Sequence, residues 1–192
     1  VAERVIEFIE TYCFVPEGAK VGQPLVLEEF QKKFIRDIYG NPHGTRRAYL
    51  AMARKNGKTA LIAALLLASI CGPEAKLNSQ IVSGAMSRDQ AALVFALAEK
   101  MIYLNPELEA ITKIVPSSKR IHGLTLNTEY RASSADASTA HGASPILIIA
   151  DEVGQVRGPS SDFYDALETS QGAHDAPLFI AISTQAASDV DM

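Results

Sequence analysis

The apolar and polar positions of the chain first follow a helical spacing and then alternate between helices and strands. Apolar residues recur at helical intervals in Val1–Tyr12 and in Leu27–Tyr39, which predicts two amphipathic helices. Residues 14–24, between them, are rich in Pro and Gly and are expected to form a loop. On the second helix, the buried face is expected to consist of Phe30, Phe34, Ile35 and Ile38.

From residue 46 onward, short apolar runs typical of buried strands are separated by helical patterns. The expected strands are residues 48–51, 80–84, 146–150 and 177–182, and the expected helices are residues 60–71, 88–104, 107–111 and 162–170. Residues 113–134 mix short apolar and polar pieces, which indicates strands or a hairpin that returns to the sheet. Strands that alternate with helices predict an α/β fold whose sheet is mainly parallel.

Composition narrows the class of protein. The 192 residues are 47% hydrophobic and 21% charged, which suits one globular domain with a full core. The formal net charge of −4 gives no global basic field, so any contact with nucleic acid must be local. The longest apolar run, residues 60–71, is too short to cross a bilayer. The sequence has no CxxC pair and no metal-ligand spacing of its histidines, and its first residue, Val1, suggests a fragment or a processed start.

The first candidate for chemistry is the loop Met52–Thr59. Its end, Gly57-Lys58-Thr59, is typical of a loop that binds phosphate, because Gly57 lets a phosphate approach the backbone and the following amides open a helix. Lys58 is expected to reach the β- and γ-phosphates, and the Thr59 hydroxyl is expected to bind Mg²⁺. The full motif has Gly five positions before Gly57, where this chain has Met52.

The second candidate is the carboxyl end of an apolar run, residues 146–150, where Asp151 and Glu152 are adjacent. A run this apolar suits a central parallel strand that is covered on both faces, and ligands of open α/β sheets bind at the carboxyl ends of strands. In a nucleotide-hydrolysing enzyme, Asp151 holds the Mg²⁺ shell and Glu152 activates the attacking water. A strand that merely ends in solvated carboxylates is the alternative.

Together, these motifs resemble the ATPase domain of the large terminase subunit of tailed bacteriophages, the motor that packages DNA into capsids. The similarity runs from about Leu25 to Gln185, and its most specific part is the variant loop Ala53–Thr59. The resemblance implies a P-loop NTPase fold of the RecA-like (ASCE) type, with a mainly parallel sheet flanked by helices. It also implies that the strand ending at Ser183 lies between the P-loop strand and the acidic strand.

The resemblance assigns roles to individual residues. Residues implied to contact ATP are Gln31, which reads the adenine, and Arg54, Lys55, Asn56, Gly57, Lys58, Thr59 and Ala60. Glu152 is implied as the catalytic base, with Lys58 and Arg54 acting on the γ-phosphate, and Thr59 and Asp151 as metal ligands. Ser183, Thr184 and Gln185 are implied to couple hydrolysis to movement. The simpler alternatives are a solvated Gln31, a surface charge at Arg54, and Ser183-Thr184 hydroxyls that satisfy strand-end amides.

The sequence departs from the family in two places. Some terminases place an Arg before the acidic strand that acts on the neighbouring subunit, whereas this chain has His141-Gly142 there, so Arg131 and Arg157 are the candidates for that trans-acting finger. The family's C-terminal nuclease domain has no room before Met192, so no nuclease activity is expected. We expect residues 1–192 to form one ATPase domain, with N-terminal helices and the adenine-reading segment in 1–45 and the nucleotide-binding core in 46–192.

The implied function is ATP hydrolysis that drives double-stranded DNA into a procapsid, with ATP and Mg²⁺ as cofactors. The implied partners are DNA, the portal protein and the small terminase subunit, in a homo-oligomeric ring in the cytoplasm of the infected host and without a membrane. A helicase or translocase of superfamily 2 is the alternative, although its acidic motif continues differently from Val153-Gly154. An ATP-binding switch is disfavoured because Glu152 supplies a base.

Overall fold

The computed structural model describes residues 1–53, 57–135, 143–155 and 161–184. Its α-helices are α1 (Ala2–Tyr12), α2 (Glu29–Tyr39), α3 (Lys58–Ile70), α4 (Arg88–Leu104), α5 (Pro106–Ala110) and α6 (Asp162–Thr169). Its strands are β1 (Arg47–Ala51), β2 (Gln80–Ala85), β3 (Thr112–Val115), β4 (Arg120–Gly123), β5 (Thr128–Ser134), β6 (Leu147–Asp151) and β7 (Leu178–Ser183). Short 3₁₀ turns are η1 (Pro116–Ser118), η2 (Val153–Gln155) and η3 (Ser170–Ala173).

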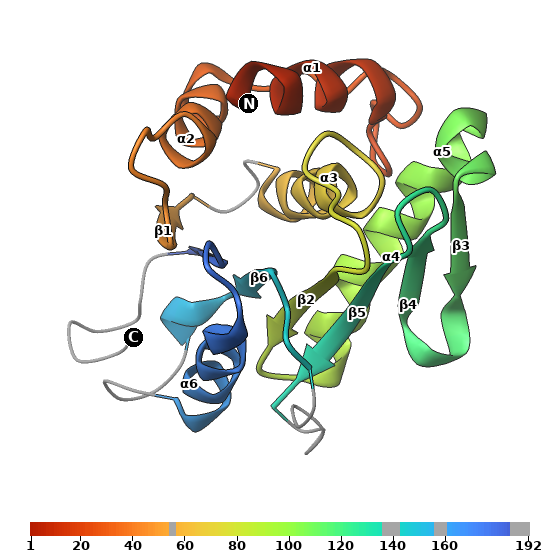
Figure 1. Cartoon of the computed structure of the whole chain (residues 1–192). Helices are drawn as coiled ribbons and strands as arrows, with labels where there is room; N and C mark the ends of the chain where they lie inside the picture. The colour runs from red at the N-terminus through yellow and green to blue at the C-terminus, as the bar shows by residue number, and fades with distance from the viewer. Residues whose placement is uncertain (54–56, 136–142, 156–160, 185–192) are drawn as a thin grey trace.

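The described strands form one sheet in the order β1-β7-β6-β2-β5-β4-β3 (Figure 1). Neighbouring strands are parallel in the part of the sheet formed by β1, β7, β6, β2 and β5. Strands β4 and β3 add an antiparallel hairpin at the β5 edge. The predicted α/β fold with a mainly parallel sheet is confirmed, and so is the hairpin. Strand β7 lies between β1 and β6, as the family resemblance implied, so the carboxyl ends of all three strands meet at one edge.

The sheet is covered on both faces, and this explains the composition of its central strand. Helices α3 and α4 lie on one face, with α1 and α2 on the far side of α3, and α6 lies on the other face (Figure 1). All five residues of β6 are buried, as expected of a central parallel strand. The acidic pair is therefore held at the end of a rigid, fully enclosed element.

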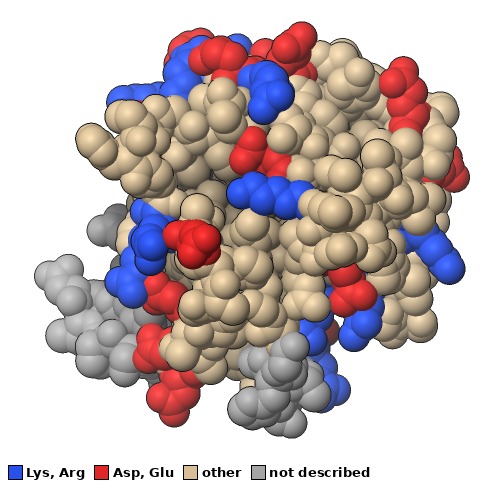
Figure 2. All heavy atoms as spheres, in the orientation of Figure 1, with Lys and Arg blue, Asp and Glu red and all other residues tan. Residues whose placement is uncertain are grey.

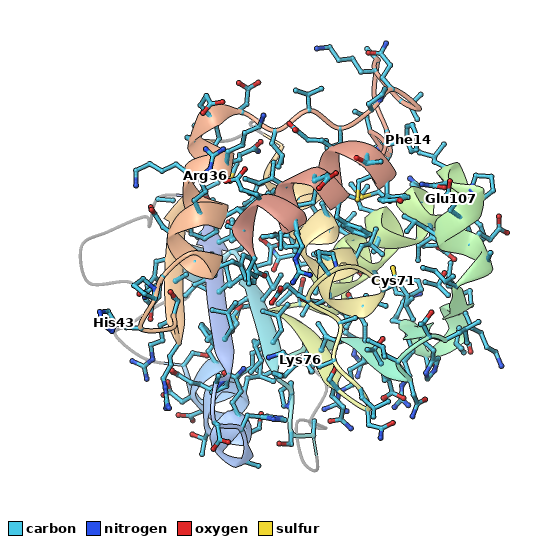
Figure 3. The ribbon with its side chains drawn as sticks, turned by 45° about the horizontal axis from the view of Figure 1, so that its top comes forward. Phe14, Arg36, His43, Cys71, Lys76 and Glu107 are labelled. Carbon is cyan, nitrogen blue, oxygen red and sulfur yellow. The ribbon has the colours of Figure 1, made fainter. Side chains whose placement is uncertain are left out.

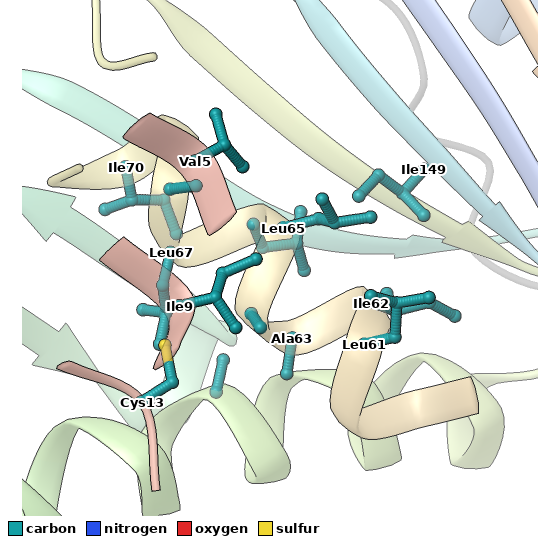
Figure 4. Packing of buried hydrophobic residues seen from close by; sticks show 14 of the residues in the cluster. Val5, Ile9, Cys13, Leu61, Ile62, Ala63, Leu65, Leu67, Ile70 and Ile149 are labelled. Carbon is teal, nitrogen blue, oxygen red and sulfur yellow. The ribbon is translucent and has the colours of Figure 1, made fainter. Parts of the chain in front are cut away.

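The main core surrounds α3, the helix that follows the candidate phosphate loop. Residues Leu61 to Ile70 of α3 are all buried, which explains why this helix lacks a polar stripe. Val5 and Ile9 of α1 pack against α3 from one side, while Ile149 of β6 lies on the other (Figure 4). Each large aliphatic side chain buried this way contributes about 1.5–3 kcal/mol. The core thereby fixes the direction of the α3 N-terminus.

The N-terminal helices are joined to each other by charged side chains as well as by apolar contacts. Arg36 of α2 (Figure 3) donates from Nε to Glu3 Oε1 of α1 at 2.7 Å, and Lys32 pairs with Glu10 at 2.9 Å. Exposed pairs of this kind contribute little, so the packing of Val5, Ile9 and Ile35 carries most of the stability.

Two details of α2 differ from the sequence-based expectation. The helix begins at Glu29 rather than Leu27, because Glu28 and Gln31 form a capping box at its N-terminus. Phe30 is 43% exposed and does not share the buried face with Ile35 and Ile38. The apolar periodicity therefore assigned one solvent-exposed aromatic residue, Phe30, to the buried face of α2.

Neither the two cysteines nor any described helix indicates redox chemistry or a membrane span. Cys13 and Cys71 are both free thiols, and burial raises the pKa of each to about 12, which makes them poor nucleophiles. Across the described residues, no helix combines the length and apolar content that crossing a bilayer requires.

Candidate nucleotide-binding site

The turn into α3 has the backbone conformation that a phosphate-binding loop needs. Gly57 has φ +73°, a left-handed conformation that favours glycine, and its carbonyl accepts the first helical hydrogen bond from Leu61 N at 2.9 Å. A Cβ atom at Gly57 would meet only Gln31 Nε2, at 4.0 Å. The amides that open α3 are thus approachable by an anion.

Lys58, the first residue of α3, reaches across the sheet edge to the two carboxylates that end β6. Its Nζ lies 2.9 Å from Asp151 Oδ1 and also pairs with Glu152 Oε1. All three side chains are largely buried, with exposed fractions of 13% for Lys58, 8% for Asp151 and 15% for Glu152. The two predicted motifs therefore meet in one charged cluster, and the alternative of solvated carboxylates is wrong.

The two carboxylates differ electrostatically although they are adjacent in sequence. Burial raises the pKa of Asp151, and the pairing with Lys58 offsets this only in part. Burial also acts to raise the pKa of Glu152, but its hydrogen bonds and charge interaction with Lys58, and its bond from Thr184, lower the pKa overall. At neutral pH Glu152 is therefore held ionised.

The residue after β6 is held in an unusual conformation. Glu152 has φ +57°, a left-handed value that costs a residue with a Cβ about 1–2 kcal/mol. Its backbone N–H donates to Ile182 O of β7 at 3.0 Å, which continues the strand pairing past the end of β6. Backbone strain of this kind concentrates at functional sites, and here it turns the Glu152 carboxylate toward Lys58 and Thr184.

The two hydroxyl residues at the end of β7 have different partners. Ser183 Oγ accepts a hydrogen bond from Gly154 N at 2.8 Å, so this residue does satisfy a strand-end amide. Thr184 Oγ1 instead donates to Glu152 Oε2 at 3.0 Å. Ser183 thus satisfies an amide just past β6, as the simple alternative expects, whereas Thr184 contacts the predicted base directly.

Tyr164 of α6 supports the acidic strand in a way that the sequence did not reveal. Its hydroxyl donates to the Asp151 carbonyl at 2.9 Å, and the residue is 2% exposed. The sequence indicated only a buried aromatic position, because helical spacing identifies an apolar face but not the partner of its polar atom. The bond fixes the backbone on which the carboxylates are carried.

Gln31 lies beside the phosphate loop but is engaged in capping α2. The side chain is 6% exposed, so the alternative of a solvated Gln31 is wrong. Its Oε1 accepts from Glu28 N at 2.9 Å, and its Nε2 lies on the side facing Gly57. The amide group therefore retains donor capacity toward the region next to the loop.

Two neighbouring pockets lie beside Gly57 and are large enough for a nucleotide. One, of about 580 Å³, is lined by residues that include Lys58, Thr59, Glu152 and Thr184. The other, of about 600 Å³, is lined on one side by Gln31 and Phe30, and the two share Gly57 and Ala60. Val15 and Glu17 of the N-terminal loop line both pockets, and the sequence had indicated only a connecting loop there.

The donor set suits a magnesium nucleotide. Asp151 Oδ1 is buried with only the Lys58 ammonium beside it, at 2.9 Å, so this oxygen suits a hydrated Mg²⁺ once Lys58 turns to a phosphate. Thr59 lines the same pocket. Within the described part of the chain, no group of three or more His, Cys, Asp or Glu side chains forms a metal cage, and Mg²⁺ in such sites is held by few protein ligands and by phosphate oxygens.

Several predicted residues fall outside this cluster. Arg54, Lys55, Asn56, Arg157 and Gln185 lie outside the described residues, as does His141-Gly142. Arg131 is on β5, which is separated from β6 by β2, so it does not line the pocket around Lys58 in its own chain.

The fold and the site together define a P-loop NTPase: a parallel sheet in which a phosphate loop ends β1, an acidic pair ends β6, and β7 lies between them. The sequence profile of the family "Terminase large subunit, ATPase domain" matches residues 29–190, and the chain belongs to this family.

Similar proteins agree with this assignment. The large terminase subunit of Enterobacteria phage HK97 is 61% identical over 190 residues, which are 99% of this chain and 38% of that protein. A crystal structure of the HK97 large terminase matches with a TM-score of 0.94 and 60% identity, over 99% of this chain and 39% of that one. The large terminase ATPase domain of Thermus phage P74-26 matches with a TM-score of 0.66 and 21% identity, over 85% of this chain and 66% of that one, which shows the fold alone. The chain thus spans about two fifths of the length of its HK97 relatives.

Proposed function

We propose that this chain hydrolyses ATP and that hydrolysis powers the packaging of double-stranded viral DNA into a procapsid. The observation that carries the proposal is the cluster of Lys58, Asp151 and Glu152, because it joins a phosphate-binding lysine to a metal-binding carboxylate and a base at one sheet edge. The 61% identity to a phage terminase large subunit supports the motor function.

In the proposed reaction, the amides after Gly57 and the Lys58 ammonium hold the phosphates, while Thr59 and Asp151 hold Mg²⁺. Bound Mg²⁺ neutralises charge on the phosphate oxygens, and catalysis is otherwise positioning and electrostatic stabilisation. Lys58 exchanges its carboxylate partners for phosphate oxygens, and this exchange frees Glu152 Oε1 to orient and deprotonate the attacking water. Arg54, four residues before Lys58 in the sequence, acts on the γ-phosphate.

Thr184 is well placed to couple the reaction to movement. Its hydroxyl holds Glu152 Oε2 at 3.0 Å, and it follows β7, whose carbonyl at Ser183 accepts from Met52 N at 2.9 Å. The base is thereby connected to the strand beside it and to the start of the phosphate loop. We infer that a change at the γ-phosphate reaches β7 through this bond, with Ser183 and Gln185 as further parts of the coupling segment.

For the whole protein, we propose a homo-oligomeric ring that acts in the host cytoplasm with the portal protein and the small terminase subunit. Residues 1–192 would form a single ATPase domain of that protein, with Gln31 reading the adenine edge. The 39% coverage of the HK97 structure leaves the greater part of such a protein to other segments.

The direct test replaces Lys58. Lys58→Ala removes the cation that binds phosphate, so we expect ATP turnover to fall to background, as measured by phosphate release. Lys33→Ala on α2, which removes an exposed lysine 74% accessible to solvent, is the matched control and should keep parental turnover. Thermal unfolding of both variants separates loss of chemistry from loss of the fold. Turnover near the parental rate in folded Lys58→Ala protein would refute the assignment.

A further inference from the structure

A third pocket, of about 300 Å³, lies at the same edge of the sheet as the two nucleotide pockets but on other elements. We call it the basic pocket and define it by Arg88, Lys119, Arg120, Arg131, Ser133 and Ser134. These residues come from the start of α4, the turn between β3 and β4, the start of β4, and the carboxyl end of β5. Because β5 is parallel to β2 and β2 to β6, the basic pocket and Asp151 face the same edge.

Among the described residues, four cationic residues and no carboxylate line the basic pocket, while Arg120 and Arg131 also line an adjoining pocket together with Glu129. Arg120 Nη1 lies 3.6 Å from Glu129 Oε1, outside the pocket lining. Lys119 donates to the Pro116 carbonyl and lies over the Phe95 ring, and it has no salt bridge to a described carboxylate. The positive charge of the pocket is therefore only partly neutralised by the described residues.

Arg131 is the most constrained of the four. Its Nη2 is buried without a hydrogen-bond partner in the described structure, and a buried unpaired donor of this kind is costly. It lies directly opposite Arg120 on the antiparallel pair β4 and β5, where like charges repel. Burial, followed by the charge of Arg120, lowers the pKa of Arg131, and the charge of Glu129 offsets this only in part. An anion bound between the two guanidinium groups would relieve both costs.

The serine residues of the pocket, together with its cations, suit a phosphate group. Ser133 and Ser134 are buried at the carboxyl end of β5 and both line the pocket. Arginine, lysine and serine are side chains that commonly contact the phosphates of DNA, and a guanidinium group can pair with a phosphate through two parallel hydrogen bonds. The pocket has half the volume of either nucleotide pocket, so it suits a single phosphate group.

We propose that the basic pocket binds a backbone phosphate of double-stranded DNA. The inference rests on the proposed packaging function, and it assigns to that function a DNA contact on this chain. The face seen in Figure 2 mixes blue and red side chains without a broad field of one sign, in keeping with the net charge of −4. DNA attraction must therefore come from local clusters such as this pocket.

The test measures DNA binding without nucleotide, by fluorescence anisotropy of a labelled duplex of mixed sequence across a salt series. Arg131→Gln is compared with Arg4→Gln, which removes an exposed arginine on α1. We expect Arg131→Gln to lower the affinity about tenfold at low salt and Arg4→Gln to leave it unchanged. The slope of log K against log salt should become shallower by about 0.9 for the lost phosphate contact.

A second pair of variants guards against misfolding of Arg131→Gln, because Arg131 is partly buried. The double variant Arg88→Gln/Lys119→Gln changes two exposed residues of the pocket, and its charge-matched control is Arg4→Gln/Lys33→Gln. Thermal unfolding checks the fold of each protein. The proposal predicts a weaker affinity and a shallower slope for the pocket variants only.

Unchanged DNA affinity and slope in both folded pocket variants would overturn the proposal. So would a loss of ATP turnover on mixing Arg131→Gln chains with parental chains while DNA binding stays intact, since this would assign Arg131 to the neighbouring subunit's nucleotide. Loss of self-association with DNA binding intact would equally overturn it, in favour of a contact between subunits. ATP turnover of Lys58→Ala, measured without DNA, tests the proposed ATPase function separately. A failure of the DNA-binding proposal can therefore be distinguished from a failure of the proposed function.

Discussion

At the scale of single residues, the site depends on how three charges share a nearly dry space. Lys58 pairs with Asp151 and Glu152, and the structure treats these carboxylates differently: one has a raised pKa and the other a lowered pKa. Binding Mg²⁺ requires the ionised form of Asp151, although burial makes this form unfavourable. The ionised form of Asp151 that Mg²⁺ binding needs is therefore the form that destabilises the fold.

This opposition predicts the behaviour of Asp151→Asn. A carboxyl group whose pKa is raised on folding stabilises the protein below its unfolded pKa, near 3.9, and this contribution is lost as pH rises through the folded pKa. At pH 7 the ionised Asp151 therefore works against folding, even with Lys58 paired to it. We expect Asp151→Asn, without nucleotide, to unfold at the parental temperature or above it, as measured by calorimetry.

The same variant should lose the increase in unfolding temperature that Mg²⁺ and ATP give the parent. Asp162→Asn, at the start of α6, is the control and should retain that increase. A clearly lower unfolding temperature for Asp151→Asn at pH 7, disappearing at pH 4, would contradict the sign of the argument.

Sequence patterns identified Lys58, Asp151 and Glu152 because each motif is local. The loop with Lys58 precedes an apolar helix, and the acidic pair follows an apolar strand, and both elements can be predicted from their own residues. The bond from Tyr164 to the Asp151 carbonyl was not predictable, since it joins residues of separate elements through a backbone atom. The left-handed conformation of Glu152 was equally hidden, because nothing in an Asp-Glu pair demands a positive φ.

At the scale of elements, Gln31 at the N-terminus of α2 both caps this helix and lies beside the candidate phosphate loop. Gln31 completes the capping box of α2 through Oε1, and the same amide lies beside Gly57 with its Nε2. The sequence predicted the helix and the nearness of Gln31 to nucleotide, but it placed the helix start two residues early. A cap depends on side-chain geometry that apolar periodicity does not encode.

The substitution Gln31→Glu separates helix capping from the proposed recognition of adenine. The carboxylate keeps an acceptor for Glu28 N, so the unfolding temperature should change little, while the donor that would face the adenine is lost. We expect the preference for ATP over GTP to fall about tenfold, as measured by competition binding, because a polar group of the site is left mismatched. Gln31→Ala should in addition lose about 1 kcal/mol of stability with its cap. Unchanged nucleotide preference in both variants would remove Gln31 from the adenine site.

At the scale of the whole molecule, the strand order determines what can reach the nucleotide. With β7 between β1 and β6, Thr184 contacts Glu152, while Arg131 lies on β5, beyond β2. The alternation of strands and helices predicted a parallel sheet, but pattern alone does not give the order of strands; that came from the family resemblance. Among the described residues, Lys58 is the only cation lining the pocket with Glu152.

The trans-acting arginine that the family resemblance implies predicts that turnover depends on neighbouring chains. A trans-acting arginine is worth roughly 10³–10⁵ in rate for phosphoryl transfer. We expect the phosphate release rate per chain to rise steeply with protein concentration. Adding Glu152→Gln chains, which lack the base but keep every arginine, should raise the rate of dilute parental chains, whereas an equal mass of albumin should not. A fast rate independent of concentration would show instead that one chain, with Arg54, suffices.

The most direct measurement of the central claim compares nucleotide binding and turnover in Glu152→Gln. Positioned proton transfer contributes about 10²–10⁴-fold, so turnover should fall by that factor while a fluorescent ATP analogue binds with parental affinity. Glu129→Gln, on β5 and outside the site, is the matched control and should keep both properties. Loss of binding with turnover unaffected, or turnover unchanged in folded Glu152→Gln, would contradict Glu152 as the base of an ATPase built on Lys58 and Asp151.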